Sequence, residues 1–398
     1  MRWISRLFII SFACLSLMTS AYANLFGGTV TVDGQQKTYS FKTIQEAVDS
    51  LSDGQLAQEF PGYNDNSNVN GDLNVRGIPI SFDYVGTTLN IDIPSLGIHE
   101  VFTGDNRDAA ENQFNNWLKG EGDAQVTKLF KGFVSNTAYD PVAGNPTSLM
   151  ARMLDNDFDI ATQAHLRRYA GITHGYNLFS FAPTYSDYTV GGTNVHQYNI
   201  PIKDSLYFNG GKSAFIFDMP ITYIDEDGTS TYSAQLGLAF AQAINKFWSL
   251  IPAFHVGAVG SVDLGSGTVV YDASLSSRTE IPIGQFEVGM TNTFDWLKTQ
   301  NVQTGAYNIN YDLTNWGFKN GLDGQYHFKN VPIALGLSYS YAVMFGDKWY
   351  IPDYNEVGFN FINTAKHNGT RYDFLTLGVD YQFAPHFDGY NVVLGMNF

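Results

Sequence analysis

The histidines and acidic residues are the side chains of this sequence that could bind a metal ion or catalyse a reaction. The eight histidines include no pair at the His-x-x-x-His spacing of a zinc helix, and His99-Glu100 lacks the second histidine that such a site needs. No Gly-x-Ser-x-Gly motif occurs. We therefore expect no cofactor, no metal site and no enzyme activity. A triad of residues distant in sequence stays an alternative, because triads are defined by geometry.

A second group of candidate residues is acidic and occupies one face of segments that read as β-strands. On that face, which otherwise carries small residues, lie Asp218, Asp272, Glu287, Asp312, Asp323, Glu356 and Asp380. Lys203 is the only basic residue that we place there. If this face lines a pore, its carboxylates favour cations and suit a small cationic solute. The alternative is that they bond to Ser, Tyr and Asn, or pair with bases of the N-terminal region, inside a plugged barrel.

A two-residue alternation along residues 177–398 predicts the strands that carry these carboxylates. Between residues 333 and 345, every odd position is aliphatic or aromatic, and most even positions are Ala, Gly or Ser. The same pattern recurs in residues 215–223, 232–240 and 375–383. Each strand thus has one apolar face and one face of small or polar residues.

A soluble β-sandwich would alternate too, so two further features decide between the classes. The small-residue face suits the crowded interior of a small barrel, whereas a solvated sheet surface would carry long charged side chains. Aromatic residues lie at several points along the apolar faces, as in the girdles of outer-membrane barrels. We predict a mainly β fold, an antiparallel transmembrane β-barrel in contact with outer-membrane lipid.

The last strand-like segment has the most specific pattern in the chain. One face of it consists of Tyr390, Val392, Leu394, Met396 and Phe398. The segment resembles the closing strand of bacterial outer-membrane β-barrels, in which a terminal aromatic residue is recognised by the barrel-assembly machinery. The stretch His-Val-Gly-Ala-Val-Gly-Ser-Val-Asp at residues 255–263 resembles an uncharacterised outer-membrane family with an autotransporter-like barrel. These resemblances imply a porin-like or autotransporter-like protein of a Gram-negative outer membrane.

The number of strands follows from the segments that alternate. These are residues 178–186, 195–203, 213–224, 231–243, 248–260, 267–276, 283–294, 306–313, 320–328, 331–345, 354–363, 370–383 and 388–398. A bacterial single-chain barrel has an even number of strands, so a total of thirteen contains one error. We expect about twelve, with one bulged strand in residues 306–328. A missed strand near residues 165–176 would give fourteen.

The start of the chain reads as an export signal. Arg2 and Arg6 precede the apolar stretch of residues 7–18, and Ala21-Tyr22-Ala23 is a small-x-small cleavage site. Sec-type export with cleavage near Ala23 would make residues 1–23 a signal peptide. It would also remove the single cysteine of the sequence.

Residues 24–165 mix short strands with helical periodicity and predict a small α+β region in front of a barrel at residues 177–398. We expect a hairpin at residues 28–33 and 37–41, strands at 73–84 and 88–93, and helices at 43–51, 108–120, 123–135 and 147–154. Residues 140–147 contain two prolines and a glycine and read as a linker or a plug loop.

The composition of the 398 residues limits the function. Charged residues make up 15% of the sequence, where about 25% is usual, and the net charge is −16. A nucleic-acid partner needs clustered Lys and Arg and is not expected. We expect a channel or small-solute transporter with an N-terminal plug, periplasmic or accessory domain. The alternatives are an autotransporter-like barrel that displays its N-terminal region at the cell surface and, third, an outer-membrane enzyme.

Overall fold

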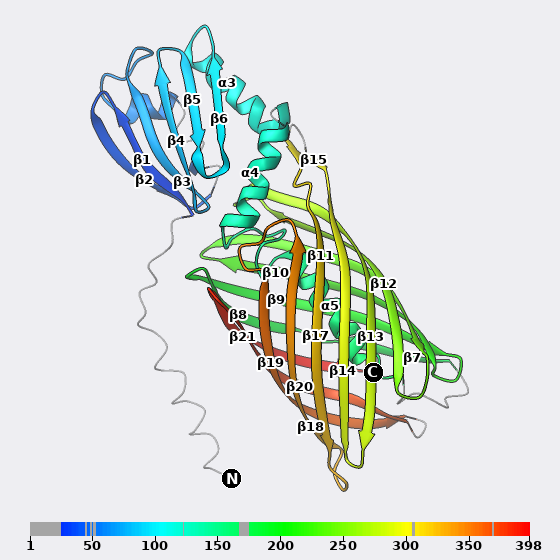
Figure 1. Ribbon diagram of the computed structural model, residues 1–398. Helices are drawn as coiled ribbons and strands as arrows, with labels where there is room; N and C mark the ends of the chain where they lie inside the picture. The colour runs from blue at the N-terminus through cyan, green and yellow to red at the C-terminus, as the bar shows by residue number, and fades with distance from the viewer. Residues whose placement is uncertain are drawn as a thin grey trace, which may run out of the picture.

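A computed structural model of the chain contains an N-terminal sheet domain and a β-barrel, and the sheet domain lies at one end of the barrel (Figure 1). The structure describes residues 25–43, 46–47, 50, 53–121, 123–166, 175–304, 307–367 and 370–398. The expected signal peptide lies outside the described residues, as does part of the expected helix at residues 43–51.

Six antiparallel strands form the N-terminal sheet in the order β2-β1-β3-β4-β5-β6. They are β1 (Phe26–Val32), β2 (Gln35–Phe41), β3 (Val69–Val75), β4 (Ile78–Val85), β5 (Thr88–Ile93) and β6 (Ile98–Thr103). The predicted β1–β2 hairpin and β5 are confirmed. The single strand predicted at residues 73–84 is wrong, because Arg76 and Gly77 have φ angles of 53° and 89° and form a tight turn between β3 and β4.

Helices cover one side of this sheet and lead to the barrel. They are α2 (Asp53–Glu59), the 3-10 turn η2 (Pro94–Leu96), α3 (Arg107–Asn116), the π-helical turn η3 (Trp117–Glu121) and α4 (Asp123–Asn136). Ala110, Val126 and Phe133 on these helices join Ile78 and Ile93 of the sheet in one buried cluster. The apolar stripes predicted at residues 108–120 and 123–135 therefore form the core of the sheet domain.

Twelve antiparallel strands close the barrel. They comprise β7 (Tyr176–Phe181) with β8 (Thr184–Val190), β9 (Thr193–Phe208), β10 (Ser213–Glu226), β11 (Thr229–Ala243), β12 (Trp248–Ser261), β13 (Ser266–Ile283), β14 (Phe286–Gln300), β17 (Thr314–His327), β18 (Ile333–Gly346), β19 (Asp353–His367), β20 (Thr370–Ala384) and β21 (Phe387–Asn397). β7 and β8 count as one interrupted strand, because both lie between β9 and β21.

The number of barrel strands depends on which strands in residues 302–327 belong to the barrel sheet. The short strands β15 (Val302–Thr304) and β16 (Tyr307–Ile309) pair with each other and not with the barrel sheet. β17 is the barrel strand of this region and pairs with β14 and β18. The segment predicted at residues 306–313 is therefore outside the barrel. The expected total of twelve is confirmed, but the expected bulged strand over residues 306–328 is wrong, because the barrel strand begins only at Thr314.

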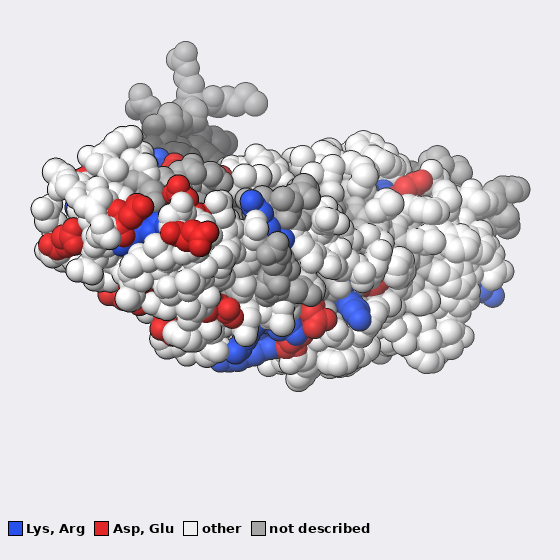
Figure 2. Space-filling view, turned by 90° about the horizontal axis from the view of Figure 1, so that it is seen from above, with Lys and Arg blue, Asp and Glu red and all other residues white. Residues whose placement is uncertain are grey.

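The predicted alternation corresponds to the two sides of the barrel wall. Along β10, Phe215, Phe217 and Met219 are 41%, 46% and 40% exposed, whereas Ile216 and Asp218 between them are buried. Large parts of the surface show neither acidic nor basic side chains (Figure 2). A closed antiparallel barrel with an apolar exterior and a polar interior is the architecture of outer-membrane β-barrels.

The two ends of the barrel differ in what they contact. The sheet domain docks at the end that carries the β12–β13 turn, where Leu264 packs with Leu25 and Phe26. Antiparallel order places the connection at residues 301–313 at this same end. β7 begins at the opposite end, where Phe398 pairs through its backbone with Phe179.

A fifth helix, α5 (Leu149–Gln163), lies inside the barrel (Figure 1). Its residues Leu149, Met153 and Leu154 are buried in a cluster with Val259 and Val270 of the wall. The helix predicted at residues 147–154 is therefore real but continues for two further turns. In the described part of the chain, no helix is long and apolar enough to cross a membrane.

Candidate functional site

The loop between α4 and α5 closes the mouth of the barrel beneath the sheet domain. Asp140 Oδ1 accepts hydrogen bonds from the backbone N–H groups of Val142 and Ala143 at 2.9 and 3.2 Å. The side-chain amide of Asn145 donates to the carbonyl of Asp140 at 2.9 Å. All residues from 140 to 150 are buried. The segment predicted as a linker or plug loop is thus a packed part of the mouth.

Arg76 joins the sheet domain to this loop and to the barrel. Its Nη2 lies 2.9 Å from Asp140 Oδ2, and its Nη1 donates to Ser266 Oγ at 2.6 Å. The hydroxyl of Tyr311 donates to the same Asp140 oxygen at 3.0 Å. Arg76 and Asp140 are 1% and 0% exposed. A buried ion pair of this kind fixes geometry, because separating it leaves an unpaired charge.

Lys319 of β17 holds α5 to one side of the wall. Its Nζ lies 2.8 Å from Asp155 Oδ1 of α5 and 3.5 Å from Glu356 Oε2 of β19. Tyr354 donates to Asp155 Oδ1 at 2.5 Å, and Gln382 donates to Glu356 Oε2 at 2.6 Å. Lys319 is 1% exposed, whereas its partners Asp155 and Glu356 are partly exposed toward the barrel cavity.

Arg278 of β13 centres a second network in the wall. Its Nη2 donates to Asp323 Oδ2 at 3.0 Å, and its Nη1 donates to Thr291 Oγ1 at 3.0 Å. Glu280, two residues further along β13, lies 2.7 Å from Nδ1 of His165, which follows α5. Glu287 lies beside the same histidine and glutamate.

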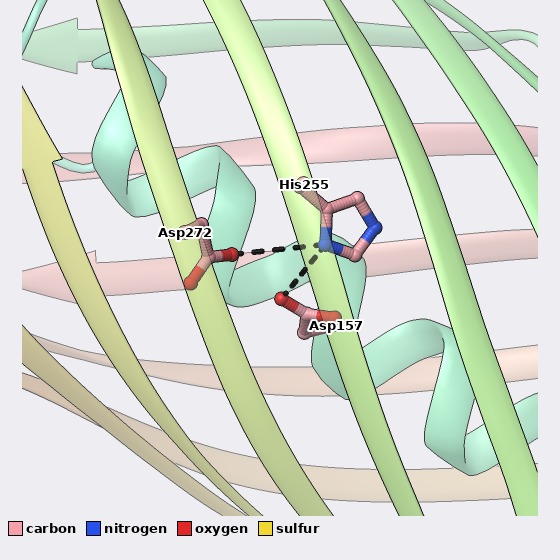
Figure 3. A group of neighbouring side chains, drawn as sticks. All are labelled: Asp157, His255 and Asp272. Carbon is pink, nitrogen blue, oxygen red and sulfur yellow. Dashed lines mark ion pairs between the residues drawn. The ribbon is translucent and has the colours of Figure 1, made fainter.

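His255 of β12 centres a third network, which joins α5 to another part of the same stretch of wall. Its Nε2 lies 3.0 Å from Asp218 Oδ1 of β10, and its Nδ1 lies 3.4 Å from Asp157 Oδ2 and 3.8 Å from Asp272 Oδ2. Asp157 projects from α5 toward the two wall residues (Figure 3). Asp218, His255 and Asp272 lie in one row across neighbouring strands, with Gly237 between the first two.

Gly237 is the reason why His255 can reach Asp218. A Cβ atom at this position would lie 2.1 Å from His255 Nε2 and 2.2 Å from Asp218 Oδ1. Such separations do not occur between real atoms. The absence of a side chain on β11 therefore opens the space in which the imidazole crosses to the next strand.

The structure distributes the predicted carboxylates over these networks. Asp218 and Asp272 meet at His255, Asp323 and Glu287 lie near Arg278 and His165, and Glu356 pairs with Lys319. Asp380 lines a cavity beside α5. Asp312 lies elsewhere: it precedes β17, its side chain is 65% exposed, and it pairs with Lys131 of α4 at 3.6 Å.

The sequence reasoning missed the bases that these carboxylates face. Arg278, Lys319 and His255 are inward-facing and 1–2% exposed, so Lys203 is not the only base of the interior. Asp295 is also buried in the wall. Arg278, Asp295 and Lys319 lie one or two positions beyond the predicted strand ends. Extending each predicted strand by two residues, with the same alternation, would have placed these three side chains in the barrel interior.

A cavity of about 360 Å³ runs beside α5 in the barrel interior. α5 packs against the wall formed by β11 to β14 and β17, which leaves the space on the other side. Asp380 lines the cavity together with Asp159 of α5, Lys203 of β9 and Asp373 of β20. The paired groups Asp155, Asp218, Lys319 and Glu356 line it as well. The interior is therefore polar but largely filled.

The predicted assembly segment forms the closing strand of the barrel. β21 pairs with β20 on one side and with β7 and β8 on the other. Tyr390, Leu394 and Phe398 are 41%, 42% and 59% exposed on the outer surface, and Val392 and Met396 are partly buried. The predicted apolar face is thus directed outward.

The sequence matches no protein-family model and no curated protein. Solved structures to which the chain is similar include the translocator domain of the autotransporter NalP from Neisseria meningitidis, at 10% identity and a TM-score of 0.46, with 63% of this chain and 94% of that chain covered. The β-domain of the Bordetella autotransporter BrkA matches at 10% identity and a TM-score of 0.43, with 56% and 98% covered. An outer-membrane channel from Pseudomonas putida matches at 12% identity and a TM-score of 0.39, with 58% and 98% covered.

Proposed function

We propose that the protein is an outer-membrane β-barrel that holds its N-terminal sheet domain at the cell surface, with α5 as the segment that passes through the lumen. The observation that carries this proposal is the path of the chain. The sheet domain lies at one end of the barrel, α5 runs inside it, and β7 begins at the other end (Figure 1). Such a path connects a domain on one side of the membrane to a first strand that starts on the other side.

The lengths of the connections support the orientation. Outer-membrane barrels have short periplasmic turns and longer extracellular loops. The connection of residues 301–313, which includes the β15–β16 hairpin, lies at the end that carries the sheet domain. Described connections at the opposite end are residues 209–212, 244–247, 284–285 and 328–332. The other connections at the sheet-domain end are residues 191–192, 227–228, 262–265, 347–352 and 385–386, so the two longest described connections, 301–313 and 347–352, are the ones that favour the cell exterior for this end.

Cysteine labelling on intact cells tests the orientation. Cleavage near Ala23 would leave a chain without cysteine, so a single introduced cysteine would report its own position. Gln36→Cys lies on the exposed β2 of the sheet domain, and Lys329→Cys lies in an exposed turn at the opposite end. With a membrane-impermeant maleimide, we expect Gln36→Cys to react on intact cells and Lys329→Cys to react only after permeabilisation. The reverse pattern would refute the display function.

A channel or small-solute transporter is the second candidate function, and the cavity beside α5 favours it. Conduction along this cavity would need α5 to move, because the helix occupies the rest of the cross-section. The remaining acidic residues would then favour cations. In planar bilayers, we expect such a pore to pass potassium in preference to chloride. A preference for chloride would contradict the channel as we propose it.

A further inference from the structure

We propose that Asp157, His255 and Asp272 form a binding site for one divalent transition-metal ion inside the barrel. One residue comes from α5 and the other two come from β12 and β13 (Figure 3). One ligand atom from each lies within 4.8 Å of the other two. An ion held there links the lumen helix to the barrel wall. This inference does not rest on either proposed function.

The separations in this group fit a shared metal ion better than hydrogen bonds. His255 Nδ1 is 3.4 Å from Asp157 Oδ2 and 3.8 Å from Asp272 Oδ2. A hydrogen bond between such atoms spans about 2.7–3.2 Å. Two ligands of a tetrahedral ion, each about 2.1 Å from the metal, lie about 3.4 Å apart. The two carboxylate ligand atoms lie within 4.8 Å of each other, so a modest closure of the group would bring all three ligand atoms onto one ion.

The same atoms lack other partners. His255 Nδ1, Asp157 Oδ2 and both carboxylate oxygens of Asp272 have no hydrogen-bond partner among the described residues. The three residues are 0–2% exposed. Buried polar atoms nearly always have a partner, and two carboxylates facing one imidazole carry an excess of negative charge. A divalent cation supplies both the missing ligand interaction and the missing positive charge.

Asp218 prepares His255 for this role. If Nε2 carries the proton, it donates to Asp218 Oδ1 across their 3.0 Å separation, and the lone pair of Nδ1 points at the two other carboxylates. Asn156 holds Asp218 in turn, by donating to its Oδ2 at 2.8 Å. A carboxylate that accepts from the far nitrogen is the usual second partner of a metal-binding histidine.

The ligand atoms indicate the class of ion. One imidazole nitrogen with two carboxylates is a mixed nitrogen and oxygen set that Zn²⁺ and Mn²⁺ accept. Mg²⁺ and Ca²⁺ prefer oxygen ligands alone, so we expect them to compete poorly. Asp295 of β14 is fully buried in the same part of the interior, with both carboxylate oxygens unpartnered in the described structure.

Metal binding to the full-length protein tests the proposal. The chain is purified from outer membranes in detergent, stripped with a chelator, and checked for a folded barrel by its heat-dependent migration in gels. Zn²⁺ or Mn²⁺ is then titrated against a chromophoric chelator. We expect one equivalent of ion per chain, and visible absorption bands when Co²⁺ is used instead.

Variants separate this site from non-specific binding. His255→Gln and Asp272→Asn should each lower the affinity for Zn²⁺ at least a hundredfold, and Asp218→Asn should lower it roughly ten- to a hundredfold. His99→Gln is the matched control, because His99 lies exposed on the sheet domain. A folded wild-type protein that binds neither ion at micromolar concentration would overturn the proposal. Equal Zn²⁺ affinity in the wild type and Asp272→Asn would overturn it too.

Discussion

The close approach across Gly237 makes the substitution Gly237→Ala a sharp test of the interior geometry. The added Cβ would lie 2.1 Å from His255 Nε2, so the imidazole must move by about 1 Å or more to restore van der Waals contact. That movement stretches the 3.0 Å separation from Asp218 beyond hydrogen-bond range. Overpacking costs about 1–3 kcal/mol. Loss of a hydrogen bond to a charged group costs about 1.5–3 kcal/mol more. We therefore expect a loss of about 3 kcal/mol or more in the free energy of unfolding.

Urea unfolding in lipid vesicles, followed by tryptophan fluorescence, measures this loss. Gly260→Ala is the matched control, because it lies on β12, the strand of His255, and its Cβ would meet nothing within 4 Å. The control should be neutral, since replacing a strand glycine by alanine removes backbone entropy at no steric cost. In a His255→Ala background, Gly237→Ala should cost less than in the wild type, because the clashing ring is gone and only the Asp218 carboxylate must still move. Equal stability of the Gly237→Ala and Gly260→Ala proteins would refute the reasoning.

Two further predictions concern the buried ion pairs. Lys319→Met leaves the partly buried Asp155 without its cation and should lower the free energy of unfolding by about 1.5–3 kcal/mol, whereas Lys131→Met at the more exposed rim should cost less than about 1 kcal/mol. Similar urea midpoints for the two proteins would contradict this. Arg76→Met leaves Asp140 unpaired where the sheet domain docks, so limited proteolysis should release that domain faster than in wild type. An unchanged cleavage rate would show that the apolar contacts alone hold the domain.

The barrel could be predicted from sequence because its pattern is local. In a membrane barrel, each strand needs an apolar residue at every second position, so a segment such as residues 333–345 carries its own signal. The strand total was harder, because the β15–β16 hairpin alternates like a barrel strand. Whether such a segment pairs with the wall or with itself depends on its neighbours in space. β6 was missed for the same kind of reason, because its pairing with β5 stabilises a segment of irregular pattern.

The interior networks could be predicted only in part. The carboxylates on one face of the strands were found, because the period of two places them there. Lys319 was missed because the predicted strand began at residue 320, whereas β17 begins at Thr314. Arg278 was missed because the predicted strand ended at residue 276, whereas β13 continues to Ile283. Asp312 was placed in the interior because the segment before β17 alternates, yet Tyr311 and Leu313 are the buried residues there and Asp312 points outward.

The role of the acidic face changes once α5 is inside the barrel. A row of carboxylates on a barrel strand favours cation passage only if the charges face water. Here Glu356 faces Lys319, and Asp218 faces His255, so these two charges are paired within the protein. The helix contributes Asp155 and Asp157 to the same two networks, where they face Lys319 and His255 of the wall. Sequence periodicity cannot reveal this match, since about a hundred residues or more separate the helix from its partners. The inner charges therefore fix the position of the helix, and a solute that enters the cavity meets paired groups such as Lys319 and Glu356 as well as Asp159 and Asp380.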